Sequence, residues 1–199
     1  MRRRRRPFRR PFRGKPSARA AMRRRGRQGV LSDKIYRELR RANKLTENGD
    51  HINAAKIFER FAVAAHDRGI LRHAPMLYLQ AAKAYVLGGE IEAGFPLAQK
   101  GLDLLAETEQ WQRLSVTGNR AIKVLKDAGF STEAGELQTW LDSTLAGRQF
   151  SPADAPAQPG QLPPKCPFCG ATIRSDEVEW IDSRSAECTY CGSAVPTDG

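Results

Sequence analysis

The chain has 199 residues, which is enough for one medium-sized helical domain and a smaller module. Its net charge of +11 comes from the N-terminus: residues 1–30 hold 13 arginines, one lysine and no acid, and the remainder carries −3. No apolar stretch follows the arginines or reaches the roughly 20 residues of a membrane span, so we expect neither a secretory signal nor a transmembrane segment.

Residues 1–30 are predicted to form a disordered, basic tail. Prolines interrupt a doubled Arg-Arg-Pro-Phe sequence, and repulsion between arginines opposes compaction. Arginine forks bind phosphate, and Phe8 and Phe12 can stack on unpaired bases. We therefore expect binding to nucleic acid or another polyanion, with a solvated tail and an anionic membrane surface as the alternatives. The arginines assigned to this binding are Arg2, Arg3, Arg4, Arg5, Arg6, Arg9, Arg10 and Arg13.

Residues 31–147 contain an internal repeat. Gly49, Gly89 and Gly129 lie 40 residues apart, and a small residue follows each glycine by five positions (Ala54, Gly94 and Ala134). Four apolar columns keep the same step: Ala42, Ala82 and Ile122; Leu45, Tyr85 and Leu125; Ile57, Leu97 and Leu137; Ala65, Leu105 and Leu145. Self-similarity at a fixed period is typical of repeat architectures.

Each repeat is predicted to be a helical hairpin, and the hairpins are expected to stack and bury a continuous core. The helix-like stretches are about 32–48 and 50–68, 75–88 and 90–107, and 110–128 and 131–146. Ser32, Asp50 and Ser131 stand at expected N-caps, and Pro75 suits a first helical turn. Pro96 falls inside the fourth stretch, so that helix is either kinked there or begins near Phe95.

These hairpins resemble the tetratricopeptide repeat family, although other helical-hairpin repeats remain alternatives. The matching features are Ala42 and Ala82, Gly49-Asp50 and Gly89-Glu90, and Ala54-x3-Phe58. The family's early tryptophan is absent, and the period of 40 exceeds the family's usual length of about 34. The resemblance implies a protein-binding scaffold that reads peptides in a groove lined by the first helix of each hairpin.

Six polar residues without an acid share one face of those first helices. They are Arg40, Gln80 and Arg120, and one turn later Asn43, Lys83 and Lys123. Such a face suits a carboxylate or an acidic peptide. The alternative is an ordinary solvated helix surface.

Residues 148–164 contain five prolines and are predicted to be an extended linker that uncouples the repeats from the C-terminal segment. That segment, residues 165–199, is called the cysteine module, and it holds every cysteine of the chain: Cys166, Cys169, Cys188 and Cys191. Two C-x2-C pairs, each followed by a glycine and separated from each other by 18 residues, form a metal-site pattern. The segment is too short for an apolar core, so we expect a bound ion to hold it together.

The two cysteine turns resemble those of the zinc ribbon family. The resemblance implies a structural Zn²⁺ on four thiolates. Iron on the same ligands and a redox disulfide are the alternatives. Between the turns, residues 178–181 are predicted to form a strand in which Val178 and Trp180 share one face. The module's own side chains sum to −3, which favours contact with protein over nucleic acid.

Together these patterns predict a mainly α protein with a small β module that acts as a non-enzymatic protein-binding adaptor in the cytoplasm. The alternative function is an RNA-, DNA- or ribosome-associated factor that uses the basic tail. No nucleophile–base set, phosphate loop or acidic pair indicates an enzyme. The histidines lack metal spacing, and Trp111 and Trp140 are expected to pack between hairpins.

Overall fold

The computed structural model describes residues 18–148, 160–176, 178–182, 184–188, 190–191 and 193–197. The chain divides into two units, residues 1–34 and 35–199, and each is described by itself. The eight arginines assigned to polyanion binding, from Arg2 to Arg13, lie outside the described residues, and so do residues 149–159 of the predicted linker.

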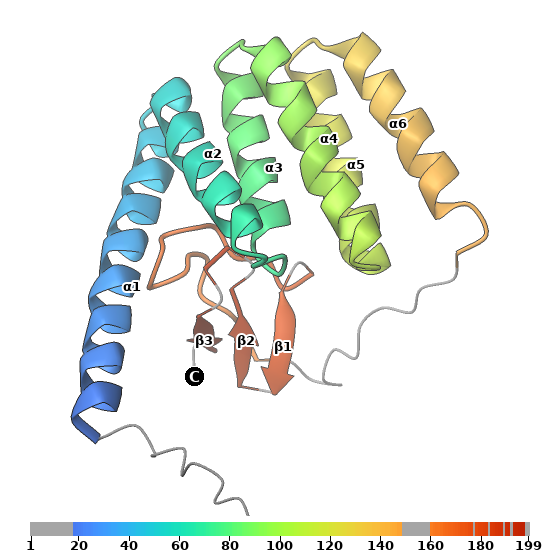
Figure 1. The fold of residues 1–199 in the computed structure, drawn as a ribbon. Helices are drawn as coiled ribbons and strands as arrows, with labels where there is room; N and C mark the ends of the chain where they lie inside the picture. The colour runs from blue at the N-terminus through green and yellow to red at the C-terminus, as the bar shows by residue number, and fades with distance from the viewer. Residues whose placement is uncertain are drawn as a thin grey trace, which may run out of the picture. The chain divides into compact units, whose positions relative to one another are not determined.

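The described residues hold six helices in the order predicted for three hairpins (Figure 1). The first hairpin consists of α1 (Ala18–Glu47) and α2 (His51–Asp67), the second of α3 (Ala74–Leu87) and α4 (Ile91–Glu107), and the third of α5 (Trp111–Asp127) and α6 (Ser131–Leu145). This arrangement confirms the predicted fold class. No helix of the described ranges is long and apolar enough to cross a membrane.

The first helix is longer than predicted. It begins at Ala18 rather than near Ser32, so Ser32 is not an N-cap and residues 18–30 are helical. Alanine, arginine and methionine dominate this stretch and are strong helix formers, and the last proline before it is Pro16. Helix propensity in residues 18–30 therefore outweighs the charge repulsion from which disorder was predicted.

The three turn glycines have the same geometry. Gly49, Gly89 and Gly129 adopt φ values of 83°, 83° and 89°, in the left-handed region that favours glycine. The residue after each glycine donates its backbone N–H to the carbonyl five positions earlier, at 2.9 Å in every case: Asp50 to Leu45, Glu90 to Tyr85 and Phe130 to Leu125. These bonds close the first helix of each hairpin in the Schellman manner. The period of 40 residues is therefore a repeat of structure as well as of sequence.

The structure decides the predicted N-caps at Asp50 and Ser131. The carboxylate of Asp50 accepts a hydrogen bond from the backbone N–H of Asn53 at 3.4 Å, which confirms the predicted cap. The predicted cap at Ser131 is wrong, because Ser131 is the first residue of α6 and Phe130 takes the cap position.

The prolines of the second hairpin stand within its helices. Pro75 lies in the first turn of α3, as predicted. Pro96 lies inside α4, which begins at Ile91, so the alternative of a helix beginning near Phe95 is wrong. The bond that Pro96 cannot donate would reach back only to Glu92, in the first turn, so most of the helix follows the interruption.

The buried residues form two apolar cores. The first core joins the first two hairpins to the cysteine module, and the second joins α3 and α4 to the third hairpin. Trp111 and Trp140 pack against the second core, in agreement with their predicted place between hairpins. The predicted apolar columns supply much of both cores.

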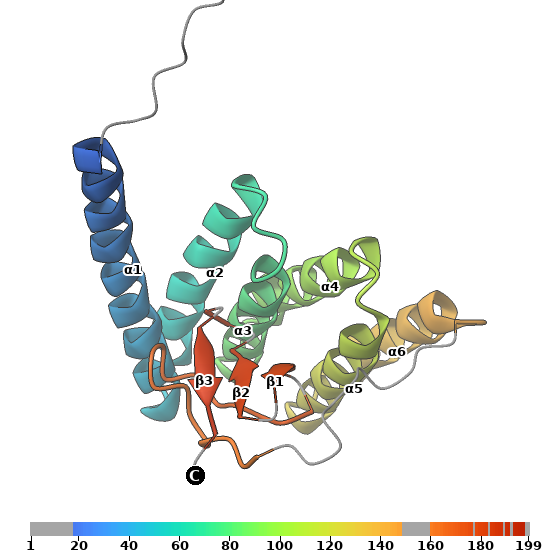
Figure 2. The ribbon, with the colours of Figure 1, turned by 90° about the horizontal axis from the view of Figure 1, so that it is seen from below.

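The cysteine module contains a small antiparallel sheet. Its strands β1 (Glu179–Asp182), β2 (Ser185–Glu187) and β3 (Ala194–Pro196) lie in that order (Figures 1 and 2). The first strand confirms the prediction for residues 178–181 to within one residue. The strand β3 was not predicted, because three residues that end in a proline carry little strand signal.

The close packing of α3 against α4 at Gly101 can be tested by substitution. A Cβ atom built on Gly101 would stand 2.9 Å from the carbonyl oxygen of Pro75, whereas one on the exposed Gly135 meets nothing within 4 Å. Overpacking costs about 1–3 kcal/mol, and alanine gains about 1 kcal/mol over glycine in a helix. We expect Gly101→Ala to lower and Gly135→Ala to raise the urea midpoint of unfolding. A rise for both variants would contradict the close approach of α3 and α4.

Candidate metal centre

The structure brings the four cysteines together. Their Sγ atoms all lie within 4.8 Å of one another, with Cys166 to Cys191 at 3.7 Å and Cys169 to Cys188 at 3.8 Å. Metal–sulfur bonds of about 2.3 Å in a tetrahedron place the sulfurs about 3.8 Å apart, whereas a disulfide requires about 2.05 Å. The spacing therefore fits four ligands around one ion and excludes the disulfide alternative in this arrangement.

Tight turns present these thiols to one point. The N–H of Gly170 donates to the carbonyl of Cys166 at 2.9 Å, and Gly170 adopts φ 77°, which explains the glycine after the cysteine pair. The N–H of Cys188 donates to the carbonyl of Ser193 at 2.9 Å and forms the second turn. Three of the thiols are buried, and only Cys191 is partly exposed.

The four thiols strongly perturb one another's ionisation. Hydrogen bonds from Cys169 and the other two thiols hold the pKa of Cys166 far below its ordinary value, while the same contact raises the pKa of Cys169. Without a cation, four adjacent thiols cannot all be ionised, because their charges repel one another. A bound metal ion removes this conflict by taking all four as thiolates.

The first helix binds the first cysteine turn directly. The guanidinium of Arg40 donates to the carbonyls of Pro167 and Phe168, and the amide of Asn43 donates to the carbonyl of Cys169 at 3.1 Å. A short module has few backbone donors of its own for these carbonyls, so the helix supplies them.

Further contacts extend this interface across the helices. Arg120 of α5 pairs with Asp176, and Glu47 of α1 pairs with Lys165. Arg72, in the α2–α3 connection, pairs with Glu187 at 2.7 Å. Charged residues from three places in the helical region thus contact the module.

An apolar core underlies these polar contacts. Cys166, Cys169, Ala171, Cys188 and Val195 belong to the same buried cluster as residues of the first two hairpins. Our expectation that the linker uncouples the module from the repeats is therefore wrong. Apolar side chains on both parts are buried by the contact, and a flexible connection does not prevent it.

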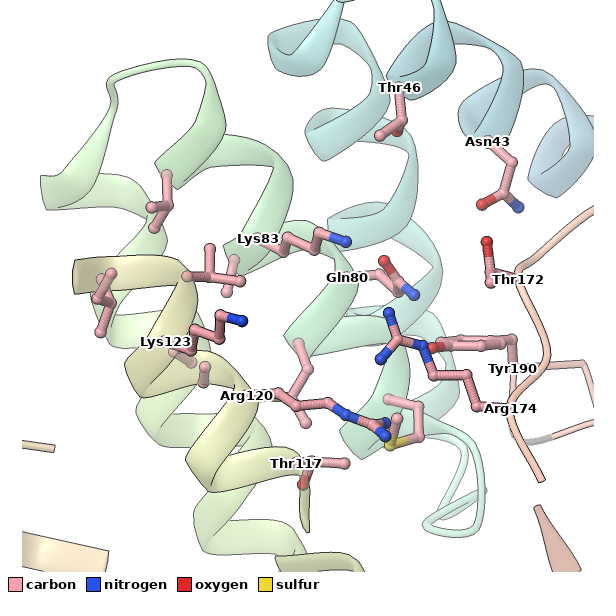
Figure 3. A pocket seen from close by; sticks show the side chains of 18 of the residues that line it. Asn43, Thr46, Gln80, Lys83, Thr117, Arg120, Lys123, Thr172, Arg174 and Tyr190 are labelled. Atoms are coloured by element: carbon pink, nitrogen blue, oxygen red, sulfur yellow. The ribbon is translucent and has the colours of Figure 1, made fainter. Parts of the chain in front are cut away.

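Five of the six polar residues predicted on the first helices line one cavity of about 400 Å³: Asn43, Gln80, Lys83, Arg120 and Lys123 (Figure 3). Arg40 contacts the first cysteine turn instead. We call the surface formed by these six residues the first-helix face. The cysteine module lines the opposite side of the cavity with Gly170, Thr172, Arg174 and Tyr190.

Arg174 and Tyr190 were missed from the sequence because nothing in their local pattern marks them as part of a site. Opposite charges offered the only signal: the module is acidic, and the first-helix face has no acid. That complementarity would have suggested that the two surfaces meet.

Comparison with protein-family models, curated proteins and solved structures finds no match to this chain.

The cluster predicts one metal ion per chain, measured by elemental analysis for zinc and iron. Because the module shares a core with the first two hairpins, we expect Cys188→Ser or chelation to lower the melting temperature of the helices as well as to unfold the sheet. The exposed substitution Ala194→Ser in the same module is the matched control. Metal-free protein with an unchanged melting temperature would contradict a structural ion.

Proposed function

We propose that this chain is a non-enzymatic adaptor in which tetratricopeptide-like hairpins bind a protein partner and a structural Zn²⁺ holds the cysteine module. The observation that supports this proposal is that the first-helix face already binds a polypeptide surface, that of its own cysteine module. Arg40 and Asn43 bind backbone carbonyls there, and Arg120 binds a carboxylate.

The chemistry of this face favours an acidic partner segment. Its donors are guanidinium, ammonium and amide groups, which suit the carbonyls and carboxylates of a peptide. Lys83 and Lys123 are exposed, and neither forms an ion pair with the residues that the structure describes. These two lysines are the cations that a partner can reach without displacing an existing ion pair.

The proposed role of the metal is structural. Four thiolates complete a tetrahedral shell and leave no position for a substrate or a reactive water. Zinc is favoured over iron because structural sites of four cysteines from two C-x2-C turns are typical of zinc. Thiols available as metal ligands are favoured in a reducing compartment, and the cytoplasm is our proposal for this one.

Charge reversal on the first-helix face tests the adaptor. We expect Lys83→Glu combined with Lys123→Glu to weaken binding of a fluorescent Glu-rich peptide by about tenfold or more, because close charge pairs at interfaces couple by more than about 1.5 kcal/mol. Fluorescence anisotropy measures the affinity. The melting temperature should not fall, since both side chains are exposed.

The double reversal Lys56→Glu and Lys126→Glu is the matched control, because these lysines are exposed and lie outside the cavity lining. If both double variants bind the peptide with the same affinity, the first-helix face is an ordinary solvated surface. A large loss of stability in the first variant would mean that the two lysines support the fold.

A second candidate function is binding to nucleic acid through the basic N-terminus. The observation that favours it is the charge of residues 1–30, where 14 basic residues occur without an acid. Nine of them precede Ala18, where α1 begins. The basic side chains of such a segment would release counterions from the nucleic acid phosphates without regard to base sequence.

Two truncations test this candidate. Binding to duplex DNA should weaken with salt by about 0.9 log units of affinity per log unit of salt for each phosphate contacted. Deleting residues 1–17 should reduce that slope, and deleting residues 1–30 should abolish it, as measured by filter binding at several salt concentrations. Unchanged affinity after the longer deletion would exclude the tail as the binding element.

A further inference from the structure

We propose that the cavity between the first-helix face and the cysteine module is a binding site for a small, multiply charged anion that carries phosphate groups or clustered carboxylates. The site needs no protein partner, so it goes beyond the adaptor function. The cavity volume of about 400 Å³ falls within the range of about 300–1,000 Å³ that is usual for small-molecule sites.

Positive charge converges on this cavity from three parts of the fold. Lys83 comes from α3, Arg120 and Lys123 from α5, and Arg174 from the cysteine module, while the acids in the lining are Glu47 and Asp127. Figure 3 shows the head groups of Lys83, Lys123 and Arg174 pointing toward the same space. Residues far apart in the sequence thus form one cationic site.

Three of these four cations belong to no ion pair within the described residues. Arg120 pairs with Asp176, but the ion pairs of the described residues include neither Lys83 nor Lys123 nor Arg174. Like charges gathered at a partly desolvated surface repel one another. An anion with more than one charge would relieve this repulsion, and a neutral ligand would not.

The state of Lys83 is consistent with such a ligand. Its residue surface is exposed, yet shielding of the ammonium group by surrounding protein lowers the pKa of Lys83, and repulsion by Arg174 lowers it further. A bound anion would oppose both effects, since it stabilises the charged form of the lysine.

The neutral residues that line the cavity indicate what else the ligand carries besides charge. Gln80, Thr172 and Tyr190 place amide and hydroxyl groups around the cavity, and Met76, Leu79 and Val86 supply apolar surface. A ligand that combines charged oxygens with a small organic body uses both kinds of surface. Phosphate esters and polycarboxylates share this chemistry.

Site-resolved lysine acylation tests the proposal on the metal-loaded full chain. Trace acylation followed by mass spectrometry reports Lys83 and Lys123 separately from the basic tail, with Lys126 of the same α5 helix as the internal control. Free pyrophosphate or citrate at about ten times its dissociation constant should slow acylation of Lys83 and Lys123 about tenfold, because only about a tenth of the sites remain empty. The rate at Lys126 should not change.

Variants that remove one charge test whether the ligand contacts the whole cluster. With Arg174→Gln or Lys123→Gln, protection of Lys83 should need about tenfold more pyrophosphate, the typical effect of losing one charged hydrogen bond. Lys126→Gln should have no effect. Arg174 belongs to the cysteine module and Lys123 to α5. If Arg174→Gln disturbs the module's structure, Lys123→Gln still tests the site.

The probes distinguish the sources of the anion. Protection by pyrophosphate supports a phosphate ligand, and protection by citrate alone supports a polycarboxylate. If only a Glu-rich peptide protects the two lysines, the small-anion site is overturned while the adaptor function stands. No protection by any probe, or equal protection of Lys126, overturns the site as well.

Discussion

Docking of the cysteine module on the first helix is the contact on which the arrangement of residues 35–199 depends. Arg40 and Asn43 bind the carbonyls of the first cysteine turn, and the cysteines beneath it join the core of the first two hairpins. The hydrogen bond from the Gly170 N–H to the Cys166 carbonyl closes this turn, and the closed turn offers its carbonyls in one direction. Arg174 and Tyr190 thereby reach the first-helix face and line the cavity.

Polar contacts and apolar burial have different roles in this docking. Ion pairs between exposed side chains, such as that of Lys165 with Glu47, contribute about 0–1 kcal/mol each. Full burial of a side chain such as Val195 contributes about 1.5–3 kcal/mol. The shared core therefore supplies most of the docking free energy, and the ion pairs and carbonyl contacts fix the orientation. The proposed adaptor function and the proposed anion site both depend on that orientation.

Local patterns predicted the parts of this protein well. The glycines at a step of 40 residues specify the hairpin turns, because a left-handed backbone conformation favours glycine at Gly49, Gly89 and Gly129. The cysteine spacing predicted the thiol cluster, since each pair needs only one tight turn. The start of the first helix was predicted too late, because helix propensity and charge repulsion in residues 18–30 oppose each other and their balance cannot be read from the sequence.

The sequence by itself thus determined the repeat, the thiol cluster and five of the cavity residues, because each of these depends on spacing along the chain. Only the tertiary structure decided that the cysteine module packs on the first helices and that Arg174 and Tyr190 complete the cavity. The physical reason is that packing between distant segments depends on matching surfaces, whereas a sequence pattern records local geometry. The repeat therefore predicts the first-helix face, but it does not predict which residues of the cysteine module lie opposite that face.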